Sequence, residues 1–139
     1  MSLSFPIEGG DFTHAGYGSS EIKRTLKKLA ADPKIVRRIA IAAYEAEINV
    51  VAHAYKGRIS AVISSDAIRV FIEDQGPGIP DIEQAMQPGF STASPKVREM
   101  GFGAGLGLPN IRDNVDFLHI ESEVSIGTIL QFCILFRNE

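Results

Sequence analysis

The stretch PKIVRRIAIAAYEAEINVVAHAY, residues 33–55, predicts one long helix around which the rest of the chain is organised. Glu45 and Asn49 lie four residues apart in it, so their side chains are neighbours one helical turn apart. Both lie on the flank of an apolar stripe at helical spacing, made of Ile35, Ile39, Ala42, Ala46 and Val50. A carboxylate and a carboxamide beside a core-facing surface are costly without polar partners, so they mark a candidate site, with a solvated helix edge as the alternative.

Length and composition are those of one ordinary globular domain, expected to span residues 1–139. Apolar residues make up 45% and charged residues 22% of the chain. The net charge of −3 gives no electrostatic reason to expect nucleic acid as a partner. No apolar run approaches the ~20 residues of a membrane span, and residues 1–10 lack signal-peptide features. We therefore expect a cytoplasmic protein with no membrane partner.

Cysteine and histidine usage argues against a disulfide framework and against a Cys/His metal site. Cys133 is the only cysteine, and it lies in an apolar strand pattern, so we interpret it as a small core residue. The three histidines are far apart and show no metal-ligand spacing. This usage is typical of a protein in a reducing compartment.

Two helices are predicted in the first part of the chain. The first begins near Ser19 or Ser20, with serine as its N-cap, and ends near Ala31. The second, long helix is opened by the dipeptide Asp32-Pro33 and closed by Gly57.

The remaining pattern predicts short strands and two further helices. In chain order we expect an edge strand Ser4–Glu8, an antiparallel hairpin of Arg58–Ser65 and Ala67–Asp74, a short helix from Asp81, a long loop over Gln87–Gly103, a helix over Leu106–Val115, and strands Phe117–Glu123 and Thr128–Phe136. Together these elements predict an α+β fold, a two-layer α/β sandwich with a mixed, mostly antiparallel sheet and helices on one face.

Two polar residues are predicted at the ends of core-facing rows. Asp74 ends the row of Ile68, Val70 and Ile72, whereas its neighbour Glu73 points to the other, solvated face. Thr128 begins the matching row of the last strand, with Leu130, Phe132, Ile134 and Phe136. A buried carboxylate must find hydrogen-bond donors, and a hydroxyl beside it makes a suitable seat for an amino-substituted aromatic ring such as adenine.

Two glycine clusters follow. In the stretch Gln75-Gly76-Pro77-Gly78-Ile79, both glycines allow positive φ and close approach of a ligand, although a simple tight turn is the alternative. In the second cluster, Gly103, Gly105 and Gly107 precede a predicted helix, whose N–H groups and dipole favour phosphate. Neither a Rossmann context nor a GxxxxGK[ST] P-loop is present.

The combination of these motifs, in their order, resembles the GHKL family of ATP-binding domains, which share the Bergerat fold and include gyrase and histidine-kinase ATPase domains. The resemblance runs from about Ile39 to Phe132. Its most specific stretches are EDQGPGIPD (73–81), GFST (89–92) and GAGLGLP (103–109). Within the family, the chain is similar to small bacterial anti-sigma-factor and stress-switch serine/threonine kinases, histidine-kinase-like domains that phosphorylate a partner protein.

The resemblance implies a nucleotide site with ATP and Mg²⁺ as cofactors. Asp74 would accept the adenine amino group, with Thr128 supporting it through a water. Gly76 and Gly78 would let the backbone close over the base, and Asn49 would hold Mg²⁺. The phosphates would be wrapped by an ATP lid that includes Gly103, Gly105, Leu106 and Gly107.

The resemblance also implies that Glu45 is the catalytic general base, taking the proton from a serine or threonine hydroxyl of a partner. Lys96 and Arg98 are candidate contacts of the γ-phosphate, with solvated loop charges as the equal alternative. His53 is interpreted as a hydrogen-bonded structural residue rather than a phosphoacceptor.

The leading functional hypothesis is a Mg-ATP-dependent serine/threonine kinase of a partner-switching pathway. Its expected substrate is a STAS-domain anti-anti-sigma or scaffold protein, with a sigma factor or a phosphatase as further partners. The main alternative is a nucleotide-gated, non-catalytic binding module that sequesters a regulatory partner. A detached histidine-kinase ATPase domain is a third interpretation. The sequence leaves the oligomeric state open, with a homodimer among the options.

Overall fold

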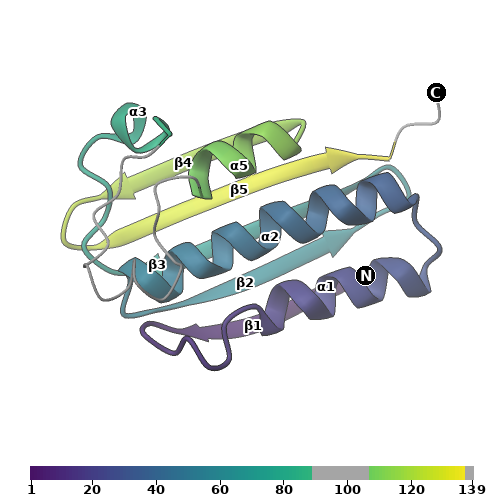
Figure 1. The fold of residues 1–139 in the computed structure, drawn as a ribbon, viewed down its shortest axis with the longest axis horizontal. Helices are drawn as coiled ribbons and strands as arrows, with labels where there is room; N and C mark the ends of the chain where they lie inside the picture. The colour runs from purple at the N-terminus through teal and green to yellow at the C-terminus, as the bar shows by residue number, and fades with distance from the viewer. Residues whose placement is uncertain (89–106, 137–139) are drawn as a thin grey trace.

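The computed structural model describes residues 1–88 and 107–136, and they form a two-layer α+β sandwich (Figure 1). The sheet has five strands in the order β1-β2-β3-β5-β4, and every neighbouring pair is antiparallel. The strands are β1 (Ser2–Glu8), β2 (Lys56–Ile63), β3 (Ala67–Gln75), β4 (Phe117–Glu123) and β5 (Gly127–Leu135). The expected fold class is confirmed, and among the described strands the sheet is antiparallel rather than mixed.

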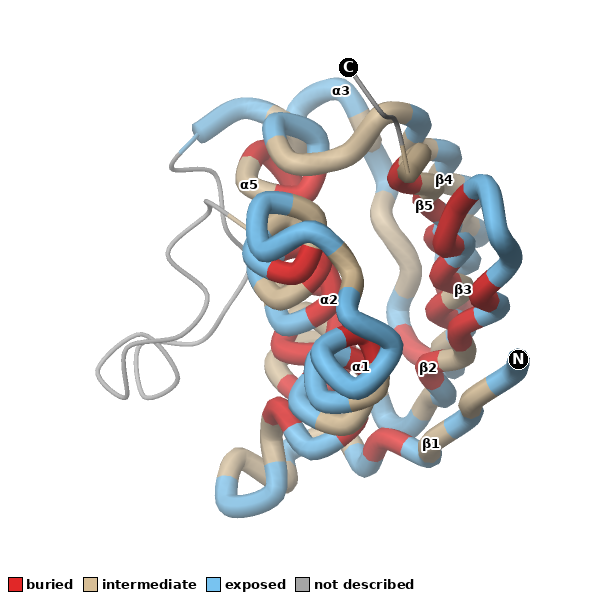
Figure 2. Tube along the Cα trace, turned by 90° about the vertical axis from the view of Figure 1, so that its right-hand side faces the viewer, coloured by how far each residue is buried: buried red, intermediate tan, exposed pale blue. Residues whose placement is uncertain are grey.

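The described helices are α1 (Tyr17–Lys28), α2 (Pro33–His53), α3 (Ile82–Ala85) and α5 (Gly107–Asn114). Three helices, α1, α2 and α5, cover one face of the sheet, as Figure 2 shows in side view, and the short α3 lies at the end of the sheet. The long helix α2 lies across the middle of the sheet, with α1 on one side and α5 on the other (Figure 1). No helix in the described ranges has the length and apolar content needed to cross a membrane.

The core lies between α2 and the central strands β3 and β5. Ile68, Val70 and Ile72 of β3 pair in register with residues of β5 that face the same way, namely Ile134, Phe132 and Leu130. All six are buried, as are the residues of the α2 stripe Ile39, Ala42, Ala46 and Val50. The apolar strand face and the apolar helix stripe are therefore buried together, as their periods of 2 and 3.6 residues predict. Ile35, at the start of the stripe, is only half-buried.

The N-terminus of α2 is built as predicted, but its C-terminus is not. The Asp32 side chain accepts the Lys34 N–H at 2.8 Å, and Pro33 occupies the first turn. The helix ends at His53, because Ala54 is extended and the Tyr55 N–H donates to Gln75 O at 2.8 Å, which starts the pairing of β2 with β3.

The prediction that Gly57 closes α2 was wrong, since Gly57 lies inside β2. A Cβ there would fall 2.5 Å from Glu73 O and 3.2 Å from the Asp74 Cβ. Gly57 is therefore required by the close approach of β3 and not by the end of a helix.

Helix α1 begins two to three residues earlier than predicted and has no serine cap. Its N-cap is Gly16, with φ at +93°, and the cap makes no hydrogen bond through a side chain of its own. The free N–H groups are satisfied from the neighbouring helix instead. The buried Glu47 of α2 accepts the Gly16 N–H at 2.9 Å and the Ser19 N–H at 2.8 Å. A carboxylate is favoured there by the positive end of the helix dipole.

Replacing Glu47 with alanine is expected to destabilise the fold by about 2–4 kcal/mol, because two buried N–H donors lose their acceptor. Chemical denaturation monitored by circular dichroism measures the change. Glu21→Ala is the matched control: Glu21 pairs with Arg24 on the outside of α1, and its loss should cost less than about 1 kcal/mol. Equal effects of the two substitutions would contradict the capping role of Glu47.

The expectation that Cys133 is a core residue was also wrong. Thr128, Leu130, Phe132 and Ile134 face the helices, so the odd-numbered positions of β5 face the other side of the sheet. Cys133 is half-buried on that side, which no described helix covers.

The remaining elements agree with the sequence patterns. Asp81 caps the short helix α3 by accepting the Gln84 N–H at 3.0 Å. The turn between β4 and β5 contains Ser125 in the left-handed region, with φ at +70°. The predicted long loop lies mostly outside the described residues, and so do Gly103, Gly105, Leu106, Lys96 and Arg98, together with the GFST stretch.

Candidate functional site

The candidate site begins with Glu45 and Asn49 on the C-terminal half of α2. Both are half-buried. The start of α5 lies against Glu45, since a Cβ at Gly107 would be 3.3 Å from the Glu45 Oε2. One turn into α5, the side chain of Asn110 hydrogen-bonds the Glu45 carboxylate. Helix α2 thus carries this carboxylate, and α5 contacts it through Gly107 and Asn110.

Burial raises the pKa of Glu45 above the ordinary glutamate value, and the hydrogen bond from Asn110 opposes part of this rise. A carboxylate with a raised pKa is a stronger base than a solvated one, provided that it stays ionised at working pH. Asn110 was not among the site residues predicted from the sequence. The available signal was its position one turn after Gly107 on the helix predicted over Leu106–Val115.

Asp74 forms the second part of the site, near the end of β3. It is half-buried on the core-facing row, whereas Glu73 is exposed, as the strand period predicts. Burial raises the pKa of Asp74, and the backbone N–H of Thr128, at 3.1 Å from Oδ1, lowers it in part. No other described group hydrogen-bonds this carboxylate, so Oδ2 remains an available acceptor.

Thr128 is buried beside Asp74 and belongs to a small hydroxyl network. Its Oγ1 lies 2.8 Å from the Oγ of Ser122 on β4. Ser122 Oγ also accepts the N–H of Ile79 at 2.7 Å, which ties the loop after Gly78 to the sheet. Ser122 was missed because it lies on an alternating strand with no motif, and its role depends on pairing with β5.

Glycines allow the backbone to pack closely around Asp74. Gly127 has φ at +156°, and a Cβ there would lie 2.0 Å from Asp74 O. Gly78 has the predicted positive φ, +76°, but Gly76 does not. A Cβ at Gly76 would lie 2.9 Å from the Cα of Ala54, so Gly76 is needed for contact with the end of α2. This contact places the Asp74 loop beside the C-terminal end of the helix that carries Asn49.

The two raised carboxyl pKa values are expected to make the ligand-free protein less stable as pH rises. A carboxyl whose pKa is higher in the folded state binds its proton more tightly there, so stability is lost from about pH 4 up to the folded pKa. Asp74→Asn and Glu45→Gln should each reduce the loss of stability with rising pH, without lowering the melting temperature at neutral pH. Melting temperatures measured between pH 4 and 8 without nucleotide test this. If both variants kept the wild-type pH dependence, the raised pKa values of Asp74 and Glu45 would be contradicted.

The chemistry of the site fits a nucleotide and a hard cation. Asp74 Oδ2 and the hydroxyl of Thr128 suit an amino-substituted base, and Gly107 opens α5 beside Glu45, where a helix N-terminus favours anions. In residues 1–88 and 107–136 no cluster of three or more His, Cys, Asp and Glu side chains could hold a metal alone. The carboxamide of Asn49 suits Mg²⁺, which keeps water and phosphate ligands.

The described elements form an α+β domain, and comparison with known proteins gives its family. Residues 18–134 match the model of the histidine kinase-like ATPase domain, and the chain belongs to that family. The resemblance inferred from the motifs is therefore confirmed.

Curated relatives narrow the similarity further. The chain is 36% identical to the serine/threonine-protein kinase RsbT of Bacillus subtilis over 98 residues, which cover 68% of each chain. It is also 36% identical to an anti-sigma F factor of a Thermoanaerobacter species over 107 residues, covering 72% of this chain and 71% of the relative.

A solved structure agrees with the fold. The crystal structure of the RsbU and RsbW domains of a Mycobacterium tuberculosis protein superposes with a TM-score of 0.66 at 17% identity. The alignment covers 99% of this chain and 33% of that one, so the chain spans about a third of the solved protein.

Proposed function

We propose that this chain is a Mg-ATP-dependent serine/threonine kinase that phosphorylates a STAS-domain anti-anti-sigma or scaffold protein in a partner-switching pathway. The observation that carries the proposal is Glu45, a half-buried carboxylate with a raised pKa, held by Asn110 and adjacent to the start of α5. A protein that only bound nucleotide would need an adenine acceptor and a phosphate-facing helix end but no base at this place. The similarity to a serine/threonine kinase and to anti-sigma F factors supports the same choice.

In this proposal the nucleotide is held by residues from three elements. Asp74 accepts the adenine amino group through Oδ2 while Oδ1 keeps the N–H of Thr128. Thr128 supports the base through a water, and the loop with Gly76 and Gly78 closes over it. Asn49 is the expected ligand of Mg²⁺, and Gly107 is the described member of the predicted phosphate-binding run, whose other members are Gly103, Gly105 and Leu106.

When bound, ATP would supply the phosphoryl group and leave as ADP, and the Mg²⁺ ion would offset part of the negative charge on the phosphates. Glu45 takes the proton from the attacking serine or threonine hydroxyl at its carboxylate oxygen. Asn110 holds that carboxylate in place, and the partial burial that raises the pKa of Glu45 strengthens it as a base. Because Asn49 lies one turn further along α2, the base and the metal ligand are held on one rigid element.

The alternative, a nucleotide-gated module that sequesters a partner without catalysis, makes the opposite prediction in one experiment. The protein is incubated with γ-labelled ATP, Mg²⁺ and purified STAS-domain proteins of the same organism, and the label is mapped by peptide mass spectrometry. We expect stoichiometric label on one serine or threonine of the STAS protein. Intact STAS binding with no transfer would overturn the kinase proposal and favour the module.

A further inference from the structure

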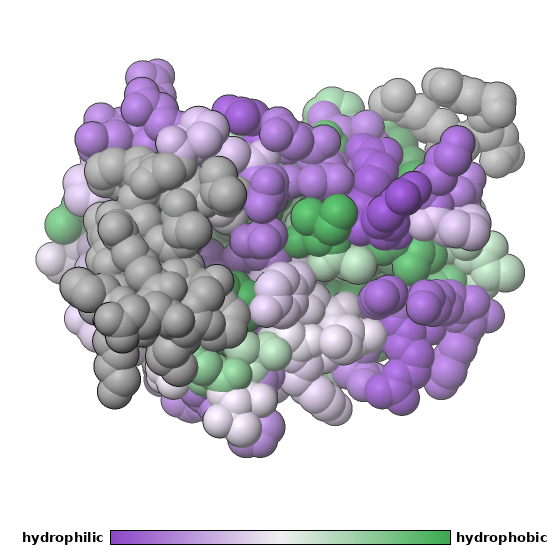
Figure 3. All heavy atoms as spheres, in the orientation of Figure 1, coloured by the Kyte–Doolittle hydropathy of each residue, from purple (hydrophilic) through white to green (hydrophobic). Residues whose placement is uncertain are grey.

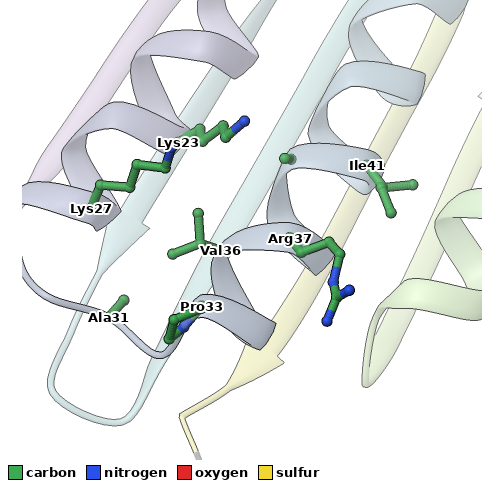
Figure 4. A pocket seen from close by; sticks show the side chains of 8 residues that line it. Lys23, Lys27, Ala31, Pro33, Val36, Arg37 and Ile41 are labelled. Atoms are coloured by element: carbon green, nitrogen blue, oxygen red, sulfur yellow. The ribbon is translucent and has the colours of Figure 1, made fainter.

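A groove separates α1 from α2, away from the nucleotide site. Its volume is about 450 Å³, and its lining comes from the C-terminal half of α1, the following turn and the N-terminal half of α2. The apolar lining residues are Ala31, Pro33, Val36, Ala40 and Ile41. Figure 4 shows Val36 between the lysine side chains of α1 and Arg37 of α2.

The groove is bordered by cations on both sides. Lys23 and Lys27 come from α1 and Arg37 from α2, and all three are exposed. None of them has an acidic partner within ion-pair distance among the described residues, whereas nearby Arg24 and Arg38 are paired with Glu21 and Asp116. In Figure 3, hydrophilic side chains lie on both sides of a paler, partly hydrophobic strip over the helical layer.

The segment around the groove is positively charged, although the whole molecule carries a net negative charge. Residues 21–38 contain seven of the 14 Lys and Arg residues, and only two acidic residues, Glu21 and Asp32, in a chain of net charge −3. Two simpler interpretations, a solvated helix face and a binding site for a small anion, do not explain why apolar residues line the groove between the cations. An apolar strip with cations on both flanks is complementary to an amphipathic helix whose apolar face is bordered by carboxylates.

We propose that the α1–α2 groove docks an acidic amphipathic helix of a partner protein. Leucine- or isoleucine-type side chains at i, i+3 or i+4, and i+7 would lie on Val36, Ala40 and Ile41, and flanking carboxylates would pair with Lys23, Lys27 and Arg37. A membrane surface fits less well, because Val36 and Ala40 line a recess and do not protrude. The groove lies on the N-terminal half of α2, so docking there is independent of the proposed kinase reaction.

The probe is a synthetic, fluorescein-labelled helix of about four turns, with leucines at i, i+3 or i+4, and i+7 and glutamates on both flanks. A second peptide carries lysine in place of each glutamate. Fluorescence anisotropy with the full chain, without nucleotide, is expected to show the acidic peptide binding at least about tenfold more tightly. Amide shifts in an NMR titration should map to α1 and to the first half of α2.

Charge reversal separates specific docking from general attraction. The double variant Lys23→Glu/Lys27→Glu should lose about tenfold in affinity for the acidic peptide and gain affinity for the lysine peptide. Lys28→Glu is the matched control, since Lys28 lies on the same helical turn of α1 as Lys27 but does not line the groove. Ile41→Ser, on the floor of the groove, should also weaken binding of the acidic peptide.

Three results would overturn the proposal. The first is that both peptides bind equally well. The second is that Lys28→Glu loses as much affinity for the acidic peptide as the double variant does. The third is that the double variant weakens binding to phosphatidylglycerol vesicles more than it weakens binding to the acidic peptide. The last result would assign the groove to an anionic lipid surface. Unfolding curves of each variant check that the fold is kept.

Discussion

Asp74→Asn is expected to weaken ATP binding by at least about 100-fold. The substitution keeps the size of the side chain and keeps an oxygen for the Thr128 N–H, so the fold should survive. It replaces the available oxygen with an NH₂ group, which would face the adenine amino group, donor against donor. Isothermal titration with a non-hydrolysable ATP analogue measures the loss.

The preference for the base gives a sharper test of the same role. Guanine carries a carbonyl where adenine carries its amino group, so the wild-type protein with Asp74 should bind GTP much more weakly than ATP. In the asparagine variant, the ratio of ATP affinity to GTP affinity should be smaller. Glu73→Gln is the matched control, because Glu73 is the adjacent carboxylate on the exposed face of β3. An unchanged ATP affinity in Asp74→Asn would show that the base binds elsewhere.

Glu45→Gln is expected to reduce phosphotransfer to the STAS substrate by about 10²–10⁴-fold while changing ATP affinity less than about threefold. Glutamine fills the same space and can keep the hydrogen bond with Asn110, but it cannot take a proton. Single-turnover transfer at saturating Mg-ATP measures the chemical step. Full transfer activity in this variant would remove Glu45 from the mechanism.

The pH dependence of transfer adds a signature that a purely structural role would not give. The wild-type rate should rise with pH as Glu45 ionises, along a limb displaced upward from ordinary carboxyl titration because burial raises its pKa. Asn110→Ala should move that limb further up, since the hydrogen bond from Asn110 lowers the pKa. In Glu45→Gln the limb should be absent.

Local periodicity made much of the fold and part of the candidate site predictable. The spacing of Ile39, Ala42, Ala46 and Val50 predicts which side of α2 is buried, because a helix repeats every 3.6 residues wherever it lies. The strand period likewise separates Asp74 from Glu73. It also placed Cys133 on the opposite face from Thr128, so that error could have been avoided from the sequence.

The tertiary structure alone decided which distant groups meet. Glu47 caps α1 across 31 and 28 residues of chain, Ser122 joins Thr128 to the loop at Ile79, and Asn110 reaches Glu45 from another helix. A sequence pattern reports the geometry of one element, but a hydrogen bond between elements depends on how they dock. By itself, therefore, the sequence determined the elements, their buried faces and the family motifs, while packing determined the partners of each buried polar group and the groove between α1 and α2.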